Sequence, residues 1–324
     1  MKKLLLIDAN SIIHRAFHAI PPFTAPDGRP SGAIYGIASI LLKLWREDRP
    51  DYAAALFDRP EPTFREQKYK EYKAHRPPAP DELITQIVEA HNLFAAFGIK
   101  TFESPGYEAD DLIATFAERF RASDEVKVVI LTGDRDTFQL IEDGHVLVQT
   151  FNKGVSDTTV YDEAAVAAKF GIAPAQMVEY KALVGDPSDN IKGVPGIGPK
   201  TAVELLQKYG SVEGIFAHIG EDPKAEKKLG AFRKEAEQSR ELVVLERHAP
   251  VDVPPLADLA PCADVKDARI EDYFINMGFA TLLKRIYEGN GDGTGAAPAK
   301  KGKKLARGAG RAAEAEGSAQ RSLF

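Results

Sequence analysis

The chain has 324 residues, 44% of them hydrophobic and 28% charged, a composition that excludes a disordered or fibrous protein. A single cysteine, Cys262, excludes an intramolecular disulfide framework, so we expect a reducing, cytoplasmic environment. The net charge of −6 would argue against a nucleic-acid partner only if it were spread evenly, and it is not.

Short aliphatic runs alternate with helical patterns in the first half of the chain. The pattern predicts an α/β fold with a central, mostly parallel sheet and crossover helices. After Tyr161 the pattern is helical as far as about Pro250, which indicates a helical extension. The predicted strands are 4–7, 52–57, 99–102, 126–131 and 146–149, and the predicted helices of the first half are 31–46, 82–97 and 107–120.

The first apolar run, residues 4–7, begins after two lysines and ends at Asp8. Four apolar residues are too few for the hydrophobic region of a signal peptide. No later run approaches the length of a membrane span, so we expect no membrane partner.

Aspartate follows three of the predicted strands. Asp8, Asp58 and Asp134 stand at or just after the ends of apolar runs, and Asp136 lies two residues further on. The carboxyl ends of parallel strands share one edge, where open α/β sheets bind ligands. Two further acidic segments supply the remaining candidates, Glu108, Asp110, Asp111, Asp186 and Asp189.

Nine carboxylates at one edge would repel one another strongly unless cations lay among them. Oxygen ligands without a neighbouring His or Cys favour Mg²⁺ or Mn²⁺ over zinc. Two such ions can activate a water and stabilise both reacting oxygens of a phosphodiester, as in nucleases. Any single one of these acids is equally well explained as a helix cap or turn residue, so the prediction depends on the whole set.

Basic and aromatic residues alternate between Asp58 and Pro80. Arg65, Tyr72, Lys73 and Arg76 belong to this stretch, which would suit a channel that holds a single strand through its phosphates and bases. A solvated surface helix with the same composition is the alternative.

Residues 193–202 read GVPGIGPKTA and precede a helical pattern. Gly193, Gly196 and Gly198 allow a tight turn and close backbone approach, and Lys200 adds a positive charge at the helix start. Pro199 suits the first helical position. The pattern is typical of a helix-hairpin-helix that binds DNA without regard to sequence; a plain helix-helix turn with glycine caps is the alternative.

These segments are collinear and resemble the 5' nucleases, meaning flap endonucleases and the 5'-3' exonuclease domain of bacterial DNA polymerase I. The resemblance covers roughly residues 1 to 290. It implies a PIN-like 5' nuclease fold with a helical arch and a C-terminal helix-hairpin-helix (H3TH) extension. We expect a nuclease domain at 1–180 with the arch at about 59–80, the DNA-binding extension at 181–289 and a disordered basic tail at 290–324.

The resemblance also implies roles by position. The nine acids would form a site for two or more Mg²⁺ or Mn²⁺ ions, and the hairpin at 185–201 would bind a monovalent cation, K⁺. Lys73 and Arg76 of the arch, with Asp134 and Asp136, are assigned to catalysis. The implied DNA contacts are Arg15, His18, Arg65, Tyr72, Lys73, Arg76, Lys192, Gly193, Gly196, Gly198, Lys200 and Thr201.

Three features depart from the DNA polymerase I pattern. Lys192 stands where proline is usual, and no polymerase sequence follows, so we expect a separate polymerase partner. The basic tail ends on QRSLF, which resembles the peptide that binds the bacterial sliding clamp through Gln320, Leu323 and Phe324. The alternative is a tail that contacts only DNA, through the lysines at 300–304.

Together these features predict a monomeric, structure-specific 5'-3' exonuclease and flap endonuclease. Its substrates would be 5'-flap, nicked or recessed-end DNA, including RNA-primed 5' strands. A PIN-like RNA nuclease is one alternative, against which the hairpin argues. A non-catalytic clamp accessory that binds flap DNA is the other, against which the complete acid set argues.

Overall fold

The computed structural model describes residues 1–155, 157–221, 223, 226, 229–259 and 261–288. Residues Met1–Tyr287 form one compact unit, and the description below concerns that unit. The predicted clamp-binding residues Gln320, Leu323 and Phe324 lie outside the described residues.

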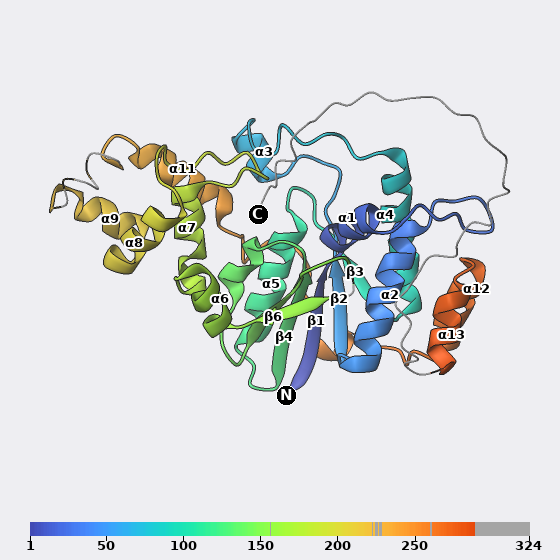
Figure 1. Cartoon of the computed structure of the whole chain (residues 1–324). Helices are drawn as coiled ribbons and strands as arrows, with labels where there is room; N and C mark the ends of the chain where they lie inside the picture. Colours follow the sequence, from blue (N-terminus) through green and yellow to red (C-terminus); the bar gives the residue numbers. More distant parts are fainter. Residues whose placement is uncertain (156, 222, 224–225, 227–228, 260, 289–324) are drawn as a thin grey trace, which may run out of the picture. The chain divides into compact units, whose positions relative to one another are not determined.

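A six-stranded sheet forms the centre of the unit, in the order β3-β2-β1-β4-β5-β6 (Figure 1). All neighbouring strands pair in parallel except β6, which is antiparallel to β5. The five predicted strands are confirmed, and β6 is an addition. The strands are β1 (Lys2–Asp8), β2 (Tyr52–Leu56), β3 (Lys100–Phe102), β4 (Val126–Thr132), β5 (Val146–Phe151) and β6 (Thr158–Tyr161).

Helices cover both faces of the sheet, because successive side chains of a strand point to opposite faces. Leu5 and Ile7 of β1 belong to one hydrophobic core, whereas Leu4 and Leu6 belong to the other. The first core is closed by α1 (Ala9–Ala19), α2 (Gly32–Glu47), α4 (Asp81–Ala96), α12 (Ala268–Asn276) and α13 (Ala280–Glu288). The second is closed by α5 (Ala109–Arg121) and by the helical extension.

The predicted helical extension is confirmed. It comprises α6 (Glu163–Phe170), α7 (Met177–Val184), α8 (Pro199–Tyr209), α9 (Val212–Ala217) and α11 (Arg233–Val243), and α7 packs against both α8 and α11. Short 3-10 turns occur at η1 (Asp136–Leu140), η2 (Pro174–Gln176), η3 (Ile219–Glu221) and η4 (Leu256–Asp258). Across the described segments, no helix combines the length and the apolar character that crossing a membrane requires.

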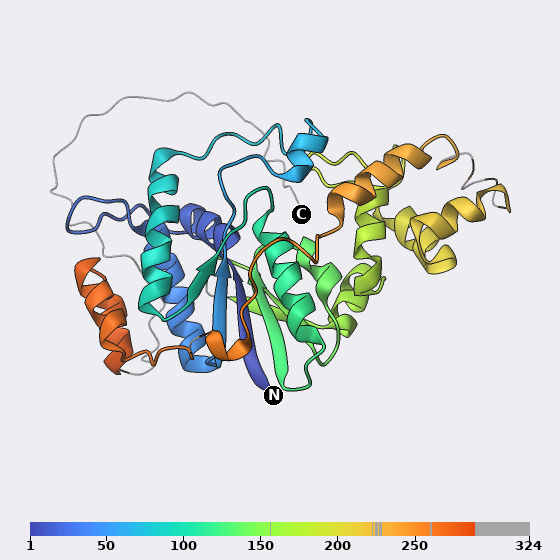
Figure 2. The same ribbon diagram turned by 180° about the vertical axis from the view of Figure 1, so that it is seen from behind.

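The segment at 59–80 is not a helical arch in this structure. Only α3 (Phe64–Lys68) is helical, and the rest runs as turns and extended chain over the carboxyl ends of the strands, between α11 and α4 (Figures 1 and 2). Lys73 adopts a left-handed backbone with φ of 53° and donates its N–H to the Asp189 carbonyl. Prolines at 77, 78 and 80 also prevent helix from continuing toward α4.

Candidate active site

The acids lie at the topological switch point of the sheet, where the order of the strands reverses. The chain adds β2 and β3 on one side of β1 and then crosses to β4 on the other side, so the strand order reverses at β1 and opens a crevice beyond its carboxyl end. Asp8 ends β1, Asp58 follows β2, and Asp134 and Asp136 follow β4, with Asp136 as the first residue of η1. The first turn of α5 and the turn after α7 bring the remaining acids, Glu108, Asp110, Asp111, Asp186 and Asp189.

Hydrogen bonds fix the acids that follow the strands. Asp8 Oδ1 accepts from the Ser11 N–H at 3.0 Å and caps α1, while its Oδ2 accepts from the Thr132 hydroxyl at 2.6 Å. Asp58 Oδ1 accepts from the Ala109 N–H at 2.7 Å, at the start of α5. Asp8 and Asp58 therefore do have the structural roles that the alternative explanation gave them. Both nevertheless lie at the same edge of the sheet.

The electrostatics of this place disfavour charged carboxylates. Burial raises the pKa of Asp8 to about 7, and the neighbouring charges of Asp58 and Asp134 add to that effect. Burial, followed by the charges of Asp8 and Asp134, raises the pKa of Asp110 well above its usual value. Burial is the larger cause of both shifts, and the charge of Lys73 offsets part of the shift at Asp110.

Several of the other acids form ion pairs with basic side chains, which neutralise part of their negative charge. Lys73 Nζ lies 2.7 Å from Glu108 Oε1, and Arg76 Nη2 lies 2.5 Å from Asp189 Oδ1. Lys181 on α7 lies 2.7 Å from Asp186 and also pairs with Asp136.

The acidic edge fits divalent cations in its chemistry. Its donors are carboxylate oxygens, and Asp110 Oδ1 is enclosed without a hydrogen-bond partner among the described residues. Within that same part of the chain, no three His, Cys, Asp or Glu side chains already form a ready-made ion site. Lys73, Arg76 and Lys181 lie among the acids and balance part of their negative charge.

Two of the predicted DNA contacts are buried and need correction. Arg65 is 1% exposed and pairs with Asp111, because its guanidinium points into the protein and not toward solvent. Tyr72 is 5% exposed, and its hydroxyl donates to Glu108 at 3.0 Å and lies 3.3 Å from Asp189. Neither side chain can stack on a base or reach a phosphate in this arrangement.

Asp111 is paired with an arginine inside the protein. Both of its oxygens accept hydrogen bonds from Arg65 at 2.7 Å, and the side chain is fully buried. Asp111 therefore differs from the acids at the edge in having a buried arginine as its partner.

The hairpin glycines differ in what they do. Gly193 is buried, and a Cβ there would collide with the backbone of Gly185, so the close packing of these two turns requires glycine. Gly196 and Gly198 are exposed, with nothing within 4 Å of where a Cβ would be. Pro199 is the first residue of α8, as predicted, and Lys200 is exposed beside it.

The remaining predicted contacts lie on the surface. Arg15 Nε donates to the Gly154 carbonyl at 2.6 Å, and His18 is exposed on the same helix, α1. Lys192 forms an exposed ion pair of 2.8 Å with Glu71 of the 59–80 segment. Thr201 is half-exposed in the first turn of α8.

Sequence reasoning missed three residues of the site. Lys181 pairs with two of the acids although no motif marked it. Thr132 bonds Asp8 and also accepts from the Asp134 N–H at 2.9 Å, and the Ser11 hydroxyl accepts from the Gly133 N–H at 2.9 Å. The position of Thr132 at the end of a strand, two residues before Asp134, is the one signal that could have found it.

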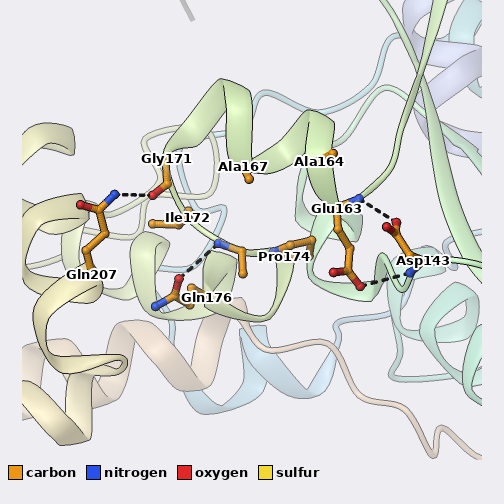
Figure 3. Close-up of a pocket in the computed structure, with 10 residues that line it drawn as sticks. Asp143, Glu163, Ala164, Ala167, Gly171, Ile172, Pro174, Gln176 and Gln207 are labelled. Atoms are coloured by element: carbon orange, nitrogen blue, oxygen red, sulfur yellow. Dashed lines mark hydrogen bonds between the residues drawn. The ribbon is translucent and has the colours of Figure 1, made fainter.

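A hollow of about 660 Å³ lies elsewhere, between α6, η2 and α8, and contains none of the nine acids (Figure 3). Its polar side chains bond the surrounding backbone: Glu163 accepts from the Asp143 N–H at 3.1 Å, and Gln207 donates to the Gly171 carbonyl at 2.7 Å. The polar side chains that line this hollow therefore stabilise the surrounding backbone.

The fold and its acidic edge together define an α/β protein of the 5' nuclease class. Family models agree: residues 3–171 match the N-terminal resolvase-like domain of 5'-3' exonucleases, and residues 172–264 match their C-terminal SAM-fold domain. The chain therefore belongs to the 5'-3' exonuclease family.

Two curated relatives differ in how much of their own length this chain matches. The 5'-3' exonuclease of Aquifex aeolicus is 42% identical over 216 residues, covering 67% of this chain and 73% of that protein. DNA polymerase I of Bacillus subtilis is 37% identical over 289 residues, which are 89% of this chain and 32% of that protein. The chain thus spans about a third of the DNA polymerase I relatives that it matches.

Solved structures show the same fold at low identity. The bacteriophage T5 5'-exonuclease with bound zinc has a TM-score of 0.62 and 21% identity, covering 86% of this chain and 99% of that one. Human GEN1 in complex with Holliday junction DNA has a TM-score of 0.58 and 15% identity, covering 88% and 71%.

Proposed function

We propose that the protein is a divalent-metal-dependent 5'-3' exonuclease and flap endonuclease. Its substrates are 5'-flap, nicked and recessed-end DNA, including strands that begin with an RNA primer. One observation carries this proposal: acids from five separate segments meet at the switch point of the sheet, where one oxygen of Asp110 is enclosed with no partner among the described residues.

We assign two or more Mg²⁺ or Mn²⁺ ions to this edge. The proposed ligands are of two kinds: Asp8, Asp58, Asp110 and Asp134 form no direct ion pair among the described residues, whereas Glu108, Asp136, Asp186 and Asp189 each pair with a basic side chain. Bound there, the ions would activate a water and stabilise the reacting oxygens of the phosphodiester.

Lys73 and Arg76 then act on the substrate. Their charges now face Glu108 and Asp189, and both residues lie on the segment that passes over the strand ends. Once other cations balance those acids, the ammonium and guanidinium groups can turn to the phosphates of the 5' strand. We propose that Lys73 binds the phosphate that is cut and that Arg76 orients the strand beside it.

The start of α8 would hold the duplex. Gly196 and Gly198 leave room for a phosphate at the helix N-terminus, where Lys200 and Thr201 present backbone N–H groups and Lys200 adds its charge. Arg15, His18 and Lys192 would add further contacts. We also propose a K⁺ ion at the hairpin, held by backbone oxygens of 185–201.

Replacement of Lys200 by alanine is expected to weaken binding of flap DNA uniformly across sequences and to reduce the slope of log K against log salt by about one. Fluorescence anisotropy in chelator, where no cutting occurs, measures both quantities. Lys208→Ala, at the opposite end of α8, is the matched control and should leave the slope unchanged. Equal slopes for all three proteins would remove α8 from the DNA interface.

The partners that we propose are a separate DNA polymerase and the bacterial sliding clamp, both met by a monomer in the cytoplasm. The clamp proposal depends on the sequence Gln320 to Phe324 alone. Deletion of these five residues should leave cleavage by the free protein unchanged but abolish its stimulation by clamp loaded on the flap substrate. Stimulation that persists after the deletion would contradict the clamp assignment.

Cleavage of three end-labelled duplexes tests the proposed activity: one with a 5' flap, one with a 3' flap and one with blunt ends, each in Mg²⁺. We expect cutting at the junction of the 5' flap and little product from the other two. An equal rate on all three would contradict structure-specific cleavage, and tight flap binding without any product would favour the non-catalytic accessory.

A further inference from the structure

A buried ion pair lies behind the acidic edge and joins three segments of the chain. Arg65 belongs to α3 and Asp111 to α5, and their side chains are 1% and 0% exposed. Nη1 and Nη2 of the arginine each donate to one oxygen of Asp111 at 2.7 Å. Nη1 lies 3.3 Å from Glu108 as well, so the pair touches one of the site acids directly.

Every donor of Arg65 has a partner. Nε donates to the Leu242 carbonyl at 3.0 Å, and Nη2 donates to the Val244 carbonyl at 2.8 Å. Together with the three contacts to carboxylates, these bonds use all five N–H groups of a guanidinium. Leu242 and Val244 lie at the end of α11, so Arg65 connects the helical extension to the first turn of α5.

The acceptor positions of Asp111 are filled in the same way. Beside the arginine, Oδ1 accepts from the Glu246 N–H at 2.9 Å and Oδ2 accepts from the Glu108 N–H at 3.2 Å. A carboxylate offers about four lone-pair directions, and four donors occupy them here. No direction remains from which this side chain could bind a metal ion.

Asp110, the preceding residue, is in the opposite situation. Its Oδ1 is enclosed without a hydrogen-bond partner among the described residues. Asp8 and Asp134 lie close enough to repel it. Two neighbouring aspartates therefore differ completely in what surrounds their carboxylates.

We infer that Asp111 is a positioning residue and not a metal ligand. With Arg65 it holds α3, the start of α5 and the end of α11 in one arrangement, and through Arg65 it orients Glu108. This inference rests on the proposed function, because it divides the acids of the proposed metal site into ligands and a support.

Thermal unfolding of the metal-free full chain distinguishes the two aspartates. Asp110→Asn should raise the midpoint by about 2 °C or more, because it removes a charge from a group of like charges. Asp111→Asn should lower the midpoint by about 6 °C or more, because it leaves the buried Arg65 without its counter-charge. A failure of Asp111→Asn to fold supports the inference equally, since loss of a ligand would not unfold a protein that holds no metal.

A double variant tests whether Arg65 and Asp111 stabilise the protein as an interacting pair. Arg65→Met combined with Asp111→Leu replaces two buried charges by apolar side chains of similar size. We expect its midpoint to lie above that of Arg65→Met alone, because each single change leaves the partner's charge unpaired. Effects that simply add would overturn the claim that the two residues act as a pair.

Calorimetric titration with Mn²⁺ measures how much each aspartate contributes to metal binding, which thermal unfolding alone does not report. Both variants should bind Mn²⁺ more weakly than the unsubstituted protein, but Asp110→Asn should lose about tenfold more affinity than Asp111→Asn, because Asp110→Asn removes a ligand whereas Asp111→Asn only displaces Glu108. On flap DNA, Asp111→Asn should lower kcat about tenfold and leave KM unchanged, because Glu108 is displaced while the DNA contacts remain.

Loss of Mn²⁺ binding in Asp111→Asn equal to that in Asp110→Asn, with a raised thermal midpoint, would overturn the inference. The unsubstituted protein separates this failure from a failure of the proposed function. If it neither binds Mn²⁺ nor cuts flap DNA, the proposed function is wrong; if it does both and the two aspartates behave alike, only the inference is wrong.

Discussion

Asp134→Ala is expected to lower the rate of flap cleavage by about 10³-fold or more while binding flap DNA almost as tightly as the unsubstituted protein. Asp134 stands at the switch point beside Asp8 and Asp110, whereas the proposed DNA contacts lie on α1, the 59–80 segment, α8 and the turn at 192–198 that precedes it. Losing a ligand removes several kcal/mol of stabilisation from the transition state and none from duplex binding.

Single-turnover cleavage in Mg²⁺ and anisotropy in chelator measure the two quantities separately. Asp124→Ala is the matched control, because Asp124 is exposed just before β4, the strand whose other end leads to Asp134. A normal rate in Asp134→Ala, or an equal loss in both variants, would contradict the assignment of the acidic edge.

Lys73→Ala is expected to lower kcat by about 10²-fold with a small change in KM, because a charge that meets the reacting phosphate acts mainly in the transition state. Its ammonium is half-buried and already lies within 2.7 Å of Glu108, so it is held inside the site and not in solvent. Steady-state kinetics on the flap substrate measure both constants.

Lys70→Ala supplies the control for that change. Lys70 is an exposed residue of the same segment and lies outside the acidic edge. If both lysines prove equally important, general attraction of DNA by the segment would account for the effect, and the specific role of Lys73 would be lost.

The sequence was sufficient for the parts of the fold that depend on local pattern. Apolar runs that end on Asp8, Asp58 and Asp134 identified three parallel strands and the edge where they meet. Pro199 after Gly198 identified the start of α8 for the same reason, since proline and glycine restrict or free the backbone locally. Such signals need no knowledge of distant neighbours.

The other features of the site depend on tertiary contacts, which local sequence patterns do not reveal. Arg65 sits in a stretch whose alternation of charge and aromatics suits a surface, yet its partners are up to 179 residues away. Lys181 looked like any lysine on a helix, because only the turn after α7 brings Asp186 back to it. The expected helix around Lys73 is absent because that residue donates its N–H to Asp189, a bond that no local pattern reveals.

Strand β6 was missed because it has few of the usual features. It is four residues long, lies at the edge of the sheet and leaves Val160 47% exposed. Its pairing with β5 depends on the intervening hairpin, and short edge strands carry little hydrophobic signal.

Dependence of flap cleavage on added metal tests the central claim most directly. The protein would be stripped with chelator, and cutting of an end-labelled 5'-flap duplex would be followed as Mg²⁺ is added back. We expect no product without metal and a rate that rises to saturation with Mg²⁺, because the carboxylates at the switch point need cations to bind a phosphodiester. Cleavage at full rate in excess chelator would contradict the account.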